Sequence, residues 1–157
     1  MDGHHNRRLR ERQEQSFRAL RKKLETIPPT EYERVMLPGG WNLKQMLGHL
    51  AFWEEAVPGA VTLLFRKQQL PESFSFGSGY VPDDPWPRDT VHNAREAAWA
   101  ADQPIDVVLS RVDNGHQMVL ELIATVTAEE AVTHADYFEA VAGHIDEHLA
   151  ELETALA

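Results

Sequence analysis

Apolar residues recur three to four positions apart along almost the whole chain, and this spacing constrains the fold more than any other feature. An α-helix places residues with that spacing on one face, whereas a strand needs alternation with a period of two. No segment shows sustained strand alternation bounded by hairpin turns. The pattern therefore predicts an all-α protein, a four-helix bundle in which amphipathic helices bury their apolar faces against one another.

Four long segments and one shorter segment carry the helical spacing. The long helices are expected over residues 9–27, 42–65, 104–126 and 136–156, and the shorter one over 90–101. Pro28 should end the first helix, because a proline disfavours helix in the residue before it. Asn42 and Gln45 form a capping-box pattern that should start the second. Pro58 lies inside the second segment and is expected to kink or break it.

A long irregular connection separates the second and third long helices. Residues 71–89 are rich in Pro, Gly and Ser and include the aromatic side chains Phe74, Phe76, Tyr80 and Trp86. So long a connection is uncommon in a compact domain and is often functional. We expect it to pack over one end or side of the bundle and to help shape a pocket.

The bulk properties limit the classes of partner. The 157 residues fit one domain, expected over residues 9–157 after a flexible N-terminal tail at residues 1–8. A formal net charge of −10 argues against nucleic acid and against an anionic membrane surface as partners. The lack of cysteine excludes disulfides, zinc–thiolate sites and a cysteine nucleophile. Because no secretory signal or membrane-spanning run is visible, a cytoplasmic location is expected.

Three histidines occupy inward-facing positions on two different helices. His144 and His148 are four residues apart in the last helix, and His49 lies in the apolar seam of the second. Imidazoles four residues apart share a helix face and can bind one metal ion. The alternative for each is a core-edge histidine that a carbonyl or carboxylate satisfies. Together the three predict a metal site with positions left open for water or substrate, as in catalytic zinc centres.

The relative depth of these histidines depends on helix direction, which the sequence leaves open. If the second and last helices are parallel, the three heights agree to within a few ångströms. If they are antiparallel, the match is poorer and the site must sit near the middle. His116 is the best candidate for a fourth ligand, whereas His92 and His134 lie near loops and are expected to have no ligand role.

Glu147 lies between the two histidines of the last helix. The segment from His144 to His148 matches the H-x-x-E-H pattern of inverzincin metalloproteases, in which the glutamate is a general base. Those enzymes are far larger, so the protease hypothesis is not favoured. Glu147 stays a candidate general base or a carboxylate that supports the ligands, and a solvent-facing helix glutamate is the alternative.

The stretch from Trp41 to Glu54, which contains His49, and the pair His144 and His148 resemble the DinB/YfiT-like superfamily of small bacterial four-helix proteins. The resemblance covers most of residues 9–156. It implies a divalent metal, nickel or zinc, on the three matching histidines, and frequent homodimers. Relatives include S-transferases and isomerases that use low-molecular-weight thiols, and some hydrolases.

Two functional hypotheses follow. The first is a metal-dependent thiol S-transferase or hydrolase that acts on a small-molecule substrate, with a low-molecular-weight thiol as a candidate cofactor. No strongly basic cluster near the histidines marks a site for an anionic thiol. The second is a non-catalytic small-molecule-binding or stress-associated bundle protein with a structural or vestigial metal site.

Overall fold

The computed structural model describes residues 3–72, 80–86 and 90–157, and within these ranges it is α-helical without a β-strand. The all-α prediction is thereby confirmed. The long helices are α1 (His4–Glu25), α2 (Leu43–Ala60), α4 (Ile105–Ile123) and α6 (Ala135–Leu156). The short elements are the 3₁₀-helix η1 (Pro29–Glu31), the π-helix η2 (Val61–Phe65), α3 (Thr90–Ala101) and α5 (Ala128–Thr133).

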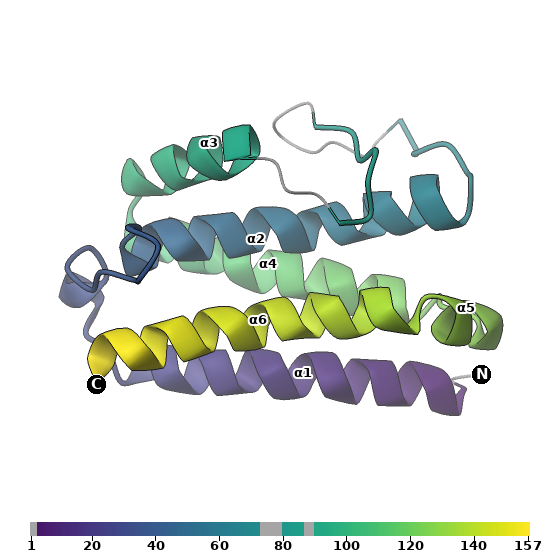
Figure 1. Ribbon diagram of the computed structural model, residues 1–157, viewed down its shortest axis with the longest axis horizontal. Coiled ribbons are helices and arrows are strands. Elements are labelled where there is room, and N and C mark those ends of the chain that lie inside the picture. The colour runs from purple at the N-terminus through teal and green to yellow at the C-terminus, as the bar shows by residue number, and fades with distance from the viewer. Residues whose placement is uncertain (1–2, 73–79, 87–89) are drawn as a thin grey trace.

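The four long helices lie along one another (Figure 1). Helix α1 packs on α6, α2 packs on α4, and α3 covers α2 on the side away from α1. Helices α1 and α6 run in one direction and α2 and α4 in the other, so α2 and α6 are antiparallel (Figure 1). The start of α2 therefore lies at the same end of the molecule as the end of α6. This answers the question of direction that the sequence leaves open.

The main core forms where the apolar faces of the long helices meet. Fully buried leucines of α2, among them Leu47 and Leu50, share one cluster with Leu20 of α1, Val112 of α4 and Ile145 of α6. Removing a leucine side chain of this kind from water contributes roughly 1.5–3 kcal/mol. The burial fixes the rotation of α2 and α6 about their axes, and so decides which of their polar residues face inward.

Helix α2 begins where the sequence predicted. The Asn42 side chain accepts a hydrogen bond from the Gln45 backbone N–H at 2.9 Å, and the Gln45 side chain accepts one from the Asn42 N–H at 3.0 Å. Pro58 does not break the helix, which continues to Ala60 and then passes into the π-helix η2. A proline cannot donate a backbone hydrogen bond. The change from α-helical to π-helical geometry begins at Val61, within one turn of Pro58.

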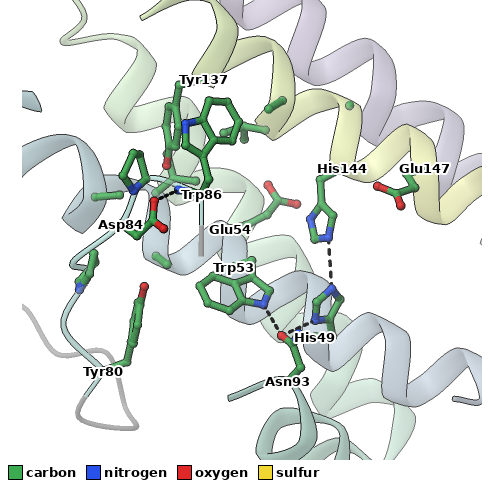
Figure 2. Close-up of a pocket in the computed structure, with 18 residues that line it drawn as sticks. His49, Trp53, Glu54, Tyr80, Asp84, Trp86, Asn93, Tyr137, His144 and Glu147 are labelled. Carbon is green, nitrogen blue, oxygen red and sulfur yellow. Dashed lines mark hydrogen bonds between the residues drawn. The ribbon is translucent and has the colours of Figure 1, made fainter. Parts of the chain in front are cut away.

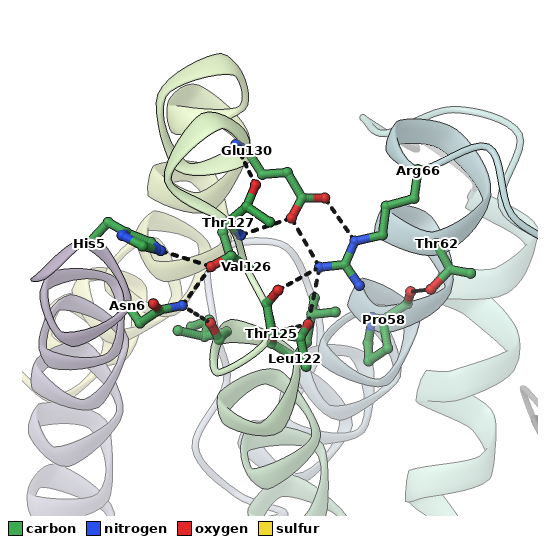
Figure 3. A network of polar contacts seen from close by, with 11 residues as sticks. His5, Asn6, Pro58, Thr62, Arg66, Leu122, Thr125, Val126, Thr127 and Glu130 are labelled. Atoms are coloured by element: carbon green, nitrogen blue, oxygen red, sulfur yellow. Dashed lines mark hydrogen bonds and ion pairs between the residues drawn. The ribbon is translucent and has the colours of Figure 1, made fainter. Parts of the chain in front are cut away.

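Helix α1 begins at His4, inside the segment that was expected to be a tail. The Asn6 side chain is buried and donates hydrogen bonds to the carbonyls of Ile123 and Val126, both at 2.7 Å (Figure 3). These carbonyls lie at the end of α4, where a helix leaves acceptors without partners inside it. His5 and Asn6 are therefore tied to the end of α4.

An ion pair fixes the turn between α4 and α6. Arg66, just after η2, donates to Glu130 of α5 at 2.8 Å, and the same carboxylate accepts from the backbone N–H of Thr127 at 2.9 Å (Figure 3). The Thr127 hydroxyl in turn accepts from the Glu130 N–H at 3.1 Å. This is a complete capping box, and it joins the end of η2 to α5.

In the ranges that the structure describes, no helix combines the length and the apolar character that crossing a bilayer requires.

Candidate metal centre

The three predicted histidines meet between α2 and α6. His49 Nε2 lies 3.1 Å from His144 Nε2, which lies 2.8 Å from His148 Nε2. One nitrogen from each residue can be chosen so that all three lie within 4.8 Å of one another. The helices are antiparallel, yet the heights match, because His49 comes about two turns after the start of α2 and His148 about two turns before the end of α6.

The orientation of His49 is set by Asn93 on α3. The Asn93 side-chain oxygen accepts from the Trp53 indole N–H at 2.6 Å and lies 3.0 Å from His49 Nδ1 (Figure 2). Since the indole only donates, the Asn93 atom between the two rings must be the oxygen, which only accepts. His49 Nδ1 therefore carries a hydrogen, and the lone pair of its Nε2 faces the other two histidines.

The three imidazoles are held in the neutral form. Burial lowers the pKa of His49 to about 4. Burial and the nearby His49 lower that of His144 to about 4, and burial together with both neighbouring histidines lowers that of His148 to about 2. Neutral imidazole is the form that ligates a metal ion.

The donor set fits a divalent metal ion. The group consists of three nitrogens without a carboxylate or thiolate, a combination that suits zinc, nickel, copper or iron. In tetrahedral zinc sites, Zn–N bonds of about 2.0–2.1 Å separate two ligand nitrogens by roughly 3.3 Å. The His49–His144 and His144–His148 distances of 3.1 and 2.8 Å are a few tenths of an ångström shorter than that. A small rotation of the rings would accommodate an ion, and three protein ligands leave room for a further one.

A cavity of about 480 Å³ opens beside the histidines. It lies between α2, α6 and the connection after residue 80, and both His49 and His144 line it (Figure 2). Its other walls are largely apolar and aromatic, and include Trp53 and Tyr137. The volume is that of a small-molecule site.

A sequence model described as the DinB superfamily matches residues 12–152. The chain belongs to the DinB superfamily. The match includes all three histidines of the cluster. No curated protein and no solved structure matches the chain.

In this DinB-superfamily chain, the described residues 80–86 of the long connection line the cavity, as the sequence predicted. Tyr80 is buried and Trp86 half exposed, and both face the cavity together with Asp84 (Figure 2). The Asp84 carboxylate accepts from the Trp86 backbone N–H at 2.8 Å, which forms a local turn. Phe74 and Phe76, which were expected in the same connection, lie outside the described residues.

The remaining histidines lie away from the cluster. His116 is buried on α4 and stacks on Phe17 of α1 with 3.7 Å between ring centroids, so it is not part of the group that can hold a metal. His134 stacks on Phe65 in the same manner, and His92 stacks on Phe52.

Glu147 lines the cavity with an exposed side chain one residue before His148. It is the candidate acid–base group that the sequence indicated.

Two residues of this candidate site in the DinB-superfamily chain were missed from the sequence. Asn93 sets the orientation of His49, but nothing in its local sequence shows that α3 lies beside α2. Glu54 is 2% exposed and lines the cavity. Its spacing was a usable signal, because Leu50, Glu54 and Val57 follow the same helical stripe.

Proposed function

We propose that this chain is a divalent-metal-dependent enzyme that acts on a small molecule, with His49, His144 and His148 as the metal ligands. One observation carries the proposal: three neutral imidazoles, from two antiparallel helices, direct nitrogens at one another beside a cavity of about 480 Å³. We take nickel or zinc as the metal, and we take the four long helices as the four-helix bundle of the superfamily.

The reaction class that we propose is thiol S-transfer or hydrolysis. A divalent ion held by the three histidines would supply Lewis acidity beside the cavity. Trp53 and Tyr137 form apolar walls that exclude water from the bound substrate. Glu147 lies at the cavity edge, one turn from His144, and its carboxylate is placed to accept a proton from an attacking thiol or water.

The test is turnover by the metal-loaded full chain. Protein loaded with zinc or with nickel is incubated with electrophile–thiol pairs and, separately, with labile esters. Under the proposal at least one class is converted, and the rate falls at least a hundredfold in His148→Ala. The variant Glu147→Gln keeps its metal but loses activity, because an amide cannot accept the proton.

The second hypothesis, a binding or stress-associated protein with a structural metal, predicts a different result. The metal would bind at about one ion per chain, yet none of the substrate classes would be converted. Stability would then depend on the metal, whereas Glu147→Gln would change nothing.

A further inference from the structure

A carboxyl group without a cationic partner lies in the wall of the same cavity. Glu54, on α2, is 2% exposed and faces the cavity between Trp86 and His144 in Figure 2. Its Oε2 accepts a hydrogen bond from the side-chain amide of Gln13 on α1 at 3.3 Å. Its Oε1 is buried and has no hydrogen-bond partner among the described residues.

The surroundings of Glu54 disfavour a negative charge. From α1 it meets the uncharged Gln13, and from α4 it meets Gly115, where a Cβ would lie 3.4 Å from the Glu54 Cβ. From α6 the cavity presents His144, which is neutral, and Glu147, which is acidic. An ionised carboxylate buried without a cation or several donors carries a large desolvation cost.

The remaining titratable groups that face the cavity do not supply a positive charge either. His49 on α2 is neutral, and Asp84 in the connection is acidic. No lysine or arginine is found among the described residues that line this cavity. Consistently, burial raises the pKa of Glu54 to about 8, although the Gln13 hydrogen bond opposes the shift.

The position of the proton follows from the hydrogen bond. Since the Gln13 amide donates to Oε2, that oxygen acts as the acceptor, and a neutral Glu54 carries its hydrogen on Oε1. Oε1 is the oxygen that lacks a protein partner. A buried donor without a partner costs free energy that a ligand with a matching acceptor recovers.

We propose that Glu54 is a neutral hydrogen-bond donor in the cavity wall and that it selects an uncharged carbonyl compound with a flat apolar body. The carbonyl oxygen of an ester, amide or ketone accepts from Oε1–H, while the apolar part lies against Trp53 and Tyr137. The proposal rests on the proposed function only in placing the ligand in the same cavity. Anionic compounds are disfavoured, because Asp84 and Glu147 also border it.

The experiment uses three probes of nearly identical shape: uncharged benzamide, cationic benzamidine and anionic benzoate. Binding to the full chain is followed through the indole N–H signals of Trp53 and Trp86 by NMR at pH 6.5 and pH 9. At pH 6.5 benzamide should bind at least tenfold more tightly than either charged probe. Its affinity should fall at least fivefold at pH 9, where Glu54 has lost its proton.

Variants of Glu54 separate the donor from the charge. Glu54→Gln keeps a donor, so benzamide should bind within threefold of the native affinity and no longer respond to pH. Glu54→Met removes the donor and should weaken benzamide at least tenfold. If Glu54→Met fails to fold, ¹³C NMR of the native glutamate carboxyls decides instead, since one of them should titrate near pH 8 and be absent from Glu54→Gln.

Two outcomes overturn the proposal. In the first, benzamidine binds most tightly of the three probes at pH 6.5, and Glu54→Gln abolishes its binding. Glu54 would then act as an anion. The other is a probe ranking that Glu54 variants leave unchanged. All binding measurements are repeated in EDTA, which removes any metal ion. The order of probe affinities therefore tests the role of Glu54 without depending on the metal ligands, and a failure of either proposal can be told from a failure of the other.

Discussion

The side-chain oxygen of Asn93 lies 3.0 Å from His49 Nδ1 and fixes which nitrogen of that histidine faces the cluster. The same oxygen accepts a hydrogen bond from the Trp53 indole N–H, so one residue of α3 orients two side chains of α2. Partners of this kind orient metal-binding histidines, and their loss costs about 10–100-fold in metal affinity. The packing of α3 on α2 therefore helps to orient a histidine of the candidate site, in addition to stabilising the fold.

Replacing Asn93 tests this relationship. Asn93→Ala removes the acceptor and should weaken zinc binding by about 10–100-fold, whereas Asn93→Asp keeps an acceptor and should retain most of the affinity. Competition with a chromophoric chelator measures both. Asn114→Ala, an exposed asparagine on α4, is the matched control and should bind zinc like the native chain. Equal affinity in Asn93→Ala would show that His49 needs no such partner.

Gly48 allows α3 to approach α2 next to the cluster. A Cβ at this position would lie 2.6 Å from the Ala100 Cβ and 3.1 Å from the Glu96 carbonyl oxygen. Gly48→Ala should therefore push α3 outward and destabilise the protein by about 1–3 kcal/mol in urea unfolding.

Gly143 on α6 is the matched control for that substitution. A Cβ there meets nothing within 4 Å, and alanine is the better helix former. Gly143→Ala should stabilise the protein by up to about 1 kcal/mol. Similar losses in both variants would contradict the close approach at Gly48.

Glu54 should make stability fall as the pH rises. Its pKa is about 8 in the fold against an ordinary value of 4.5, so between these values the folded state holds one more proton than the unfolded chain. The free energy of unfolding should drop through this window by up to about 1.4 kcal/mol per pH unit from this group. Glu54→Gln should remove the drop, and urea unfolding at pH 5, 6.5 and 8 compares the two. Parallel pH curves would mean that Glu54 is ionised in the fold.

Glu130 should act in the opposite direction. The hydrogen bond from Arg66 is the largest cause that lowers its pKa, to about 2 from 4.5, so the stabilisation is present above pH 4.5 and is lost as the pH falls towards 2. Glu130→Gln should cost about 1–3 kcal/mol at pH 7 and almost nothing near pH 2. Glu129→Gln, an exposed neighbour on α5, should cost little at either pH. If Glu130→Gln lowered the free energy of unfolding equally at both pH values, the capping box with Thr127, and not the ion pair with Arg66, would explain the loss.

The sequence predicted what local patterns determine. The helical spacing, the capping box at Asn42 and the inward positions of His49, His144 and His148 each follow from residues within one or two turns. What remained hidden depends on contacts between distant segments. Asn6 becomes helical and buried because it satisfies carbonyls at Ile123 and Val126, more than a hundred positions away.

The site shows the same division between local and distant information. The three clustered histidines could be predicted, because helix periodicity places them in or beside apolar seams. The direction of α6 relative to α2 could not, since either direction would bury the same faces. Asn93 was missed for a related reason: its partners lie on another helix.

The metal content of the untagged full chain tests the central claim most directly. Elemental analysis after purification and dialysis should give close to one divalent ion per chain in the native protein and in the control His4→Ala, whose histidine is exposed. His148→Ala should retain less than a tenth of that amount while keeping its helical circular dichroism. Equal metal content in His148→Ala and the native chain, or no metal in either after loading with zinc and nickel, would contradict the three-histidine site.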